Sequence, residues 1–288
     1  MSAASFPSRR MHLRGNFLIG SVLVALLFGM AVLSLIWTPW PTGFDALNIP
    51  HKLQTPSWHH WFGTDQLGRD ILSLILAGAR TSILVGVVAV GIGLILGTLL
   101  GLLSASRGGW IDDVVMRCAD ITFAFPALLS AIMLQVTYGA STITAIIAIG
   151  IFNIPVFARV ARAAANGVLP KDYVRAARIA GRTQIGILRD HVLPNISAPL
   201  IVQATLQFAN AILAEAALSY LGLGTQPPQA SWGRMLNDAQ TQLFGTAAQA
   251  PMLAIYPGAA IALAVLGLNL MGDGLRDYLD PRLARTRA

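Results

Sequence analysis

The chain has 288 residues, of which 55% are hydrophobic and only 11% carry a charged side chain. A typical soluble domain carries about 25% charged residues, and the apolar residues here form long uninterrupted blocks, so an integral membrane protein is predicted. The formal net charge of +7 would favour nucleic-acid binding in a soluble protein, but these basic residues lie at the edges of the apolar blocks. The single cysteine, Cys118, excludes an internal disulfide and a metal cluster built on cysteines.

Six apolar segments are long enough to cross a bilayer, because a spanning helix needs roughly 20 residues. The first follows a basic stretch, and we interpret it as a retained span because its apolar run is too long for a signal peptide. The charge-free stretch from Ile121 to Ala158 is too long for one crossing, and the residues from Tyr138 to Ser141 divide it into two antiparallel spans. The resulting all-α prediction places the six spans at residues 16–37, 81–104, 120–138, 142–165, 196–221 and 251–271.

The distribution of Lys and Arg predicts the orientation of these spans. With the N-terminus inside, the outer segments hold four basic residues: Lys52, Arg69, Arg80 and Arg234. The inner segments hold the other sixteen: Arg9, Arg10, Arg14, Arg107, Arg117, Arg159, Arg162, Lys171, Arg175, Arg178, Arg182, Arg189, Arg276, Arg282, Arg285 and Arg287. This bias predicts a multi-pass protein of a bacterial inner membrane with both termini in the cytoplasm.

The spans divide the chain into three parts. Residues 1–79 comprise the N-terminal tail, the first span and an outer loop of about residues 38–79. Residues 80–272 form a transmembrane domain of five spans, and residues 273–288 form a cytoplasmic tail. On the outer loop, Asp65, Arg69 and Asp70 either contact another protein or cap and pair at the start of the second span, and helix-start signals favour the second interpretation.

The inner loop of about residues 166–195 carries a periodic basic pattern. Arg175, Arg178, Arg182 and Arg189 are spaced by three, four and seven residues, so they would share one face of a continuous helix. Gly181 is expected to bend that helix in its middle, and Pro194 to end the segment. Two interpretations are open from the periodicity alone: an amphipathic helix on anionic lipid, or a docking helix for a cytoplasmic partner.

The spacing of residues in this loop resembles the cytoplasmic motif of ABC importer permeases. That motif reads Glu-Ala-Ala, three residues, Gly, nine residues, Ile, any residue and Leu-Pro, and the matching residues are Ala176, Ala177, Gly181, Leu193 and Pro194. Arg175 stands at the Glu position, which leaves the charge pairing with a partner open. His191 stands at the Ile position, which is similar to the dipeptide, oligopeptide and nickel subgroup, where His-x-Leu-Pro-Asn is common.

Further segments resemble the same subgroup. They comprise residues 62–70 and 78–82 before the second span, and residues 215–224, 227–228 and 231–233 at the end of the fifth. The resemblance implies a type I ABC importer permease that forms half of a translocation pathway for peptides, or for nickel or glutathione-like solutes. It also implies four kinds of partner: a second related permease, two cytoplasmic ATP-binding subunits, an extracytoplasmic solute-binding protein and membrane lipid, with no nucleic acid.

The resemblance further implies that the inner-loop residues Arg175, Ala176, Ala177, Gly181, His191, Leu193 and Pro194 couple the chain to the ATP-binding subunits. Neither lysine, Lys52 or Lys171, follows the Gly-rich spacing of a phosphate-binding loop. No catalytic or metal-ligating arrangement stands out either. We therefore expect no enzymatic activity, no cofactor and no metal site in this chain, with ATP bound by the partner subunits.

Polar residues within spans are candidates for a pathway or gate. Glu215, the only glutamate in the chain, either lines the pathway or pairs with a neighbouring helix, with Arg80 or a partner subunit as the candidate partners. Asn153 in the fourth span is a second candidate, although it and Pro155 favour a kink, and Asn269 in the sixth span is similarly ambiguous. An ion-gradient-driven secondary transporter or channel is the alternative function, but it would favour charges in several spans.

Small residues in the second span predict close helix packing. Without a hydrophobic driving force in lipid, glycines let two backbones approach and gain van der Waals contact. The residues concerned are Gly86, Gly91, Gly93, Gly97 and Gly101.

Overall fold

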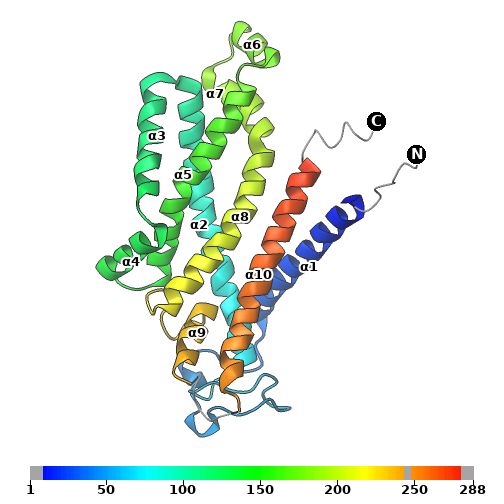
Figure 1. Cartoon of the computed structure of the whole chain (residues 1–288), viewed down its shortest axis with the longest axis vertical. Coiled ribbons are helices and arrows are strands. Elements are labelled where there is room, and N and C mark those ends of the chain that lie inside the picture. The colour runs from blue at the N-terminus through cyan, green and yellow to red at the C-terminus, as the bar shows by residue number, and fades with distance from the viewer. Residues whose placement is uncertain (1–8, 243–247, 280–288) are drawn as a thin grey trace, which may run out of the picture.

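The computed structural model describes residues 9–242 and 248–279, with side chains from residue 15 onward. Within these ranges the chain is helical and forms no strand beyond one isolated bridge between Thr64 and Asp70. Five helices are long and apolar enough to cross a membrane, which confirms the predicted all-α membrane class. They run side by side along the molecule (Figure 1) and are α1 (Arg9–Ile36), α2 (Ile71–Arg107), α5 (Thr142–Val168), α8 (Leu193–Tyr220) and α10 (Ala250–Leu279).

The third predicted span differs from its predicted form as a single helix over residues 120–138. It is built from α3 (Gly109–Ala124) and α4 (Ala127–Tyr138), whose axes meet at 81°. Pro126 lies at the break and forces the residue before it, Phe125, into an extended conformation. The described residues therefore contain six spans when this bent pair counts as one.

The second span begins earlier than predicted, and the outer loop is correspondingly shorter. Asp70 caps α2, because its side chain accepts a hydrogen bond from the backbone N–H of Ser73 at 2.8 Å. The helix then continues for 37 residues to Arg107. Arg80, counted above among the basic residues of the outer segments, therefore lies inside α2, where its guanidinium donates to the backbone carbonyl of Ser34 on α1.

Close packing of α2 against α5 and α8 forms the centre of the bundle. A Cβ on Gly93, Gly97 or Gly101 would run into α5, and one on Gly86 would lie 2.6 Å from the ring of Phe208 on α8. The predicted close approach is therefore confirmed at four glycines. It is wrong for Gly91, where a Cβ would meet nothing within 4 Å.

The two ends of the molecule carry different structures. The start of α1 and the end of α10 lie at the same end as two short helices, α6 (Asp172–Ile179) and α7 (Gln184–Ile187), as Figure 1 shows. The opposite end holds α9 (Trp232–Gln240) and the segment between α1 and α2, with two 3₁₀ turns, Phe44–Ala46 and Ile49–His51. Three basic residues of the predicted inner set lie outside the described residues: Arg282, Arg285 and Arg287.

Candidate functional site

The inner loop is fixed to the helix bundle by one face and open on the other. Val174 of α6 and Ile187 of α7 are fully buried in the core that α2, α5 and α8 share. Ile179 and Ile185, by contrast, are 88% and 79% exposed. Because the buried residues couple the loop to α5 and α8, a force applied to the open face would be transmitted to those helices.

Gly181 ends α6 with a sharp change of direction. Its φ is +79°, in the left-handed region that favours glycine, and a Cβ there would meet nothing within 4 Å. The N–H of Gly181 donates to the carbonyl of Arg178, and the N–H of Arg182 donates to that of Ala177, both at 3.1 Å. This pair of bonds is the Schellman arrangement that terminates a helix.

The four arginines therefore do not share one face of a continuous helix, and that prediction is wrong. Arg175 and Arg178 lie on α6, Arg182 lies in the turn, and Arg189 lies in a π-helical turn, Leu188–Val192. The physical reason is the left-handed backbone at Gly181, which no α-helix accommodates. The loop instead forms two short helices around a glycine corner.

Pro194 does not end the segment, which is a second correction. It lies in the first turn of α8, where proline is tolerated because that N–H lacks a partner within the helix. His191 precedes it in the π-helical turn, half-buried, with its ring 6.2 Å from the ring of Tyr173 on α6. Of the other motif residues, Ala176 and Leu193 are exposed and Ala177 packs against the core.

A cavity of about 560 Å³ opens between the α3–α4 break, α5 and α8. Phe123 and Phe125 line it from the break, and three carboxamides line it from the helices: Asn153, Gln207 and Asn210. Gln207 Nε2 donates to Asn153 Oδ1 at 2.8 Å, and Asn210 Nδ2 donates to Gln207 Oε1 at 2.9 Å. Asn153 was predicted from the sequence as a pathway candidate, whereas Gln207 and Asn210 were not, although their three-residue spacing in an apolar span was a usable signal.

Glu215 is fully buried on α8 and does not line this cavity. Its Oε1 accepts hydrogen bonds from the hydroxyls of Ser219 at 2.6 Å and Thr225 at 3.1 Å. Arg80 contacts Ser34 instead, so the suggested Arg80 pairing is wrong. Within this chain the geometry favours packing for Glu215. Asn269 is half-buried on α10 and is likewise absent from the cavity lining.

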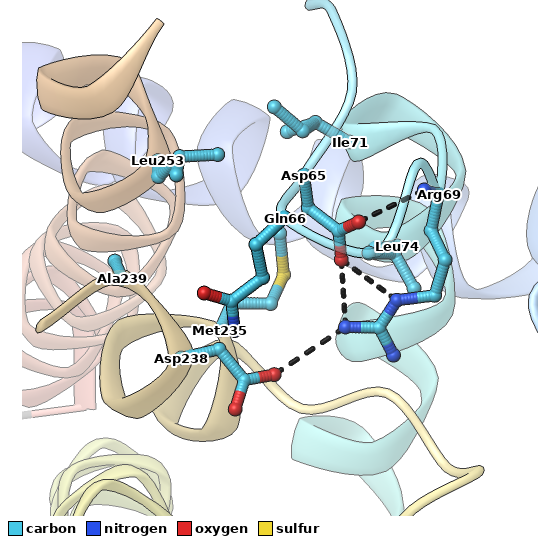
Figure 2. A pocket seen from close by; sticks show the side chains of 9 residues that line it. All are labelled: Asp65, Gln66, Arg69, Ile71, Leu74, Met235, Asp238, Ala239 and Leu253. Atoms are coloured by element: carbon cyan, nitrogen blue, oxygen red, sulfur yellow. Dashed lines mark hydrogen bonds and ion pairs between the residues drawn. The ribbon is translucent and has the colours of Figure 1, made fainter. Parts of the chain in front are cut away.

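The opposite end of the molecule is tied together by ion pairs (Figure 2). Arg69 lies between two carboxylates, with its Nη2 2.7 Å from Asp65 and 3.3 Å from Asp238 of α9. Arg234 also pairs with Asp238, at 3.0 Å. The outer-loop residues thus cap and pair, as the helix-start signals indicated, and they join the loop to α9.

Comparison with known proteins identifies the family. Residues 93–285 match the family described as "Binding-protein-dependent transport system inner membrane component". The chain belongs to this family. It is therefore a multi-pass inner-membrane permease component that works with other parts of a transporter, as the inner-loop motif indicated.

Two curated relatives agree with this assignment. The chain is 42% identical over 266 residues to the "Dipeptide transport system permease protein DppC" of Alkalihalophilus pseudofirmus, covering 92% of this chain and 86% of the relative. It is 40% identical over 278 residues to the "Glutathione transport system permease protein GsiD" of Escherichia coli O157:H7, covering 96% and 88%.

A solved structure shares the fold. The match is an inward-facing conformation of the MetNI methionine ABC transporter, with a TM-score of 0.55 and 18% identity. It covers 75% of this chain and 96% of that one. The predicted type I ABC importer architecture is thereby confirmed.

Proposed function

We propose that the chain is one of two permease subunits of an ATP-driven importer of short peptides and forms half of the translocation pathway. The observation that carries this proposal is the inner loop, which is buried on one face by Val174 and Ile187 and open around Gly181 on the other. A surface built in this way suits a partner that pushes on the bundle.

The partners in this proposal are a second, related permease, two cytoplasmic ATP-binding subunits and an extracytoplasmic solute-binding protein. ATP is hydrolysed by the ATP-binding subunits, and this chain acts without a catalytic residue, cofactor or metal. Both termini are cytoplasmic. This orientation is supported by Figure 1, where α6 and α7 share one end of the molecule with the start of α1 and the end of α10.

Motion passes in this mechanism from the loop to the cavity. Movement of the ATP-binding subunits displaces α6 and α7, and their buried residues carry the displacement into α5 and α8. Those two helices form one wall of the cavity, and the break at Phe125 forms the other. Rocking of the two walls would open the cavity alternately to each side of the membrane.

Peptides are the proposed cargo because the two curated relatives carry dipeptide and glutathione in their names. The chemistry of the cavity is compatible with that class. Among the described residues that line it none is charged, and its polar groups are carboxamides and a threonine hydroxyl. Such a lining accepts a peptide backbone without requiring a particular charge on the side chains.

The test compares Gly181→Trp with Gly181→Ala in the purified complex of permeases, ATP-binding subunits and binding protein. Both variants place a side chain at φ +79°, and neither meets another atom of this chain at its Cβ, so they share the backbone strain. They differ in the bulk presented to a partner. We expect Gly181→Trp to assemble in the membrane but to lose ATP hydrolysis stimulated by the loaded binding protein, while Gly181→Ala keeps most of it.

Equal stimulated hydrolysis in the two variants would count against a docking role for the loop.

A second measurement addresses the alternative of an ion-gradient-driven transporter. Peptide uptake should cease when the ATP-binding subunits are inactivated, and uptake that persists at the wild-type rate would favour the alternative.

A further inference from the structure

Three carboxamides form a hydrogen-bonded chain that ends in the cavity. Asn153 begins it on α5, Gln207 continues it on α8, and Asn210 ends it one turn later on the same helix. Asn153 and Gln207 are only 6% and 8% exposed, whereas Asn210 is exposed. These three hydrogen-bonded side chains, which we call the amide chain, therefore lead from the packed interior of the bundle to an accessible amide group.

The buried end of the amide chain packs directly against α2. A Cβ on Gly93 of α2 would overlap the side chain and backbone of Asn153, so the two helices are in direct contact at this position. Asn153 in turn fixes Gln207 by accepting its Nε2 hydrogen, and Gln207 fixes Asn210 by accepting one Nδ2 hydrogen. Because each carboxamide has an oxygen and a nitrogen end, this sequence of bonds sets the orientation of the last one.

Asn210 keeps two unused hydrogen-bonding groups in this orientation, its Oδ1 and its second Nδ2 hydrogen. The C=O and N–H of a trans peptide bond point to opposite sides, but an extended residue presents its own N–H and C=O on one edge, and these two groups are complementary to the free groups of Asn210. Every residue except proline carries both groups whatever its side chain, so this pairing recognises a backbone without reading its sequence. The nearby rings of Phe123 and Phe125 offer apolar contact to the side chains.

We propose that Asn210 binds the backbone N–H and C=O of one extended residue of the transported peptide through this pair of hydrogen bonds, with Gln207 and Asn153 as positioning residues. The inference rests on the proposed peptide-import function and names the group that the cavity recognises. Contact through neutral amides also suits a transport step. Binding has to be favourable enough for entry yet weak enough for release, and a buried ion pair would hold the cargo more tightly.

The experiment uses the complete complex in proteoliposomes with two labelled probes, L-alanyl-L-alanine and its analogue methylated at the peptide nitrogen. The analogue lacks the N–H that Asn210 Oδ1 would accept. Uptake is measured with the binding protein saturated. The quantity compared is the uptake rate of the dipeptide divided by that of the methylated analogue. Since every variant uses the same binding protein, its own preference cancels between variants.

We expect Asn210→Leu to lower the ratio about tenfold by slowing the dipeptide and sparing the analogue. Gln207→Leu should lower it less, because Asn210 remains but is no longer oriented. Asn210→Gln, which keeps a carboxamide, should restore part of the ratio. Asn16→Leu removes an exposed amide from α1 outside the cavity lining and should leave the ratio unchanged.

Stimulated ATP hydrolysis controls for assembly, and it should stay near wild type in each variant. A wild-type ratio in an assembled Asn210→Leu complex that transports both probes would overturn the inference alone. Absence of dipeptide uptake by the wild-type complex would instead overturn the proposed peptide cargo, and the inference with it.

Discussion

Gly97 of α2 and Phe157 of α5 approach so closely that a Cβ on Gly97 would lie 2.7 Å from the Cβ of Phe157. Phe157 is fully buried at this contact. Gly93 and Gly101, one turn away on either side, pack against the same helix. The α2–α5 contact is therefore a row of glycines that allows two spans to touch along their backbones.

Gly97→Ala should destabilise the permease, because the added methyl group has no room between α2 and α5. Overpacking of this kind costs about 1–3 kcal/mol. Gly91→Ala is the matched control on the same helix, since a Cβ there meets nothing within 4 Å and alanine has the higher helix propensity. Thermal unfolding of the detergent-solubilised complex should show a lower midpoint for Gly97→Ala only. Equal midpoints would mean that the helices separate easily at this contact.

Glu215→Leu should destabilise the end of α8 without changing what is transported. The substitution removes the acceptor for the hydroxyls of Ser219 and Thr225, and each buried polar group left without a partner costs about 1–3 kcal/mol. Glu215→Gln keeps an acceptor of similar shape and should be milder. The measurements are thermal stability and peptide uptake per assembled complex. Loss of uptake in a stable, assembled Glu215→Gln complex would favour a pathway role instead.

The spans could be predicted from the sequence because each of them is a long apolar segment. Twenty consecutive apolar residues have few alternatives to a membrane helix, and the glycine row in α2 has a direct meaning in lipid. The break in the third span was harder to predict. Pro126 marks it, but a proline inside a span also fits a mild kink, and the angle of 81° depends on how α3 and α4 pack against α5.

The candidate site was only partly predictable for a similar reason. Gly181 was identified from motif spacing, but its left-handed backbone divides the arginines between two elements, and periodicity alone assumes one helix. Gln207 and Asn210 stand three residues apart in an apolar span, but nothing in the sequence links this pair to Asn153. Their hydrogen bonds to one another and to Asn153, on a different helix, exist only in the folded bundle.

Trp232→Phe should loosen α9 from the bundle. Trp232 is fully buried, and its Nε1 donates to the backbone carbonyl of Ile75 on α2 at 3.0 Å. Loss of this hydrogen bond and of ring volume should cost about 1–3 kcal/mol in stability. Trp58→Phe makes the same chemical change at a residue that is 97% exposed and should fall within about 0.5 kcal/mol of wild type. The measurement is a thermal-shift assay on both variants. Equal shifts would contradict the role of Trp232 in holding α9 against the bundle.

Cysteine labelling should place the two ends of the molecule on opposite sides of the membrane. In a Cys118→Ser background, Trp58→Cys and Ile179→Cys each introduce one exposed thiol, between α1 and α2 and on α6 respectively. With cytoplasmic termini, a membrane-impermeant maleimide applied to intact spheroplasts should label Trp58→Cys and leave Ile179→Cys unlabelled until the cells are permeabilised. The reverse pattern would overturn the proposed orientation.

Charge reversal at Arg175 should weaken docking of the ATP-binding subunits. The Arg175 side chain is 66% exposed, and its nearest acidic partner, Asp172, lies 3.9 Å away and is itself fully exposed. Arg178 on the same helix is also exposed, so α6 presents a net positive surface, which calls for an acidic surface on the partner. An exposed ion pair contributes about 0.2–1 kcal/mol, so Arg175→Glu should raise the dissociation constant up to about fivefold.

The salt dependence of this loss identifies its cause. Screening shortens the reach of exposed charges, so the difference between Arg175→Glu and wild type should shrink as the ionic strength rises. Arg276→Glu, the same change at an exposed residue in the last turn of α10, is the control and should bind as wild type does. Tighter binding by Arg175→Glu would mean that the partner surface is basic. A basic partner surface would suit the Glu that the family motif has at this position. Arg175 would then weaken docking in this transporter.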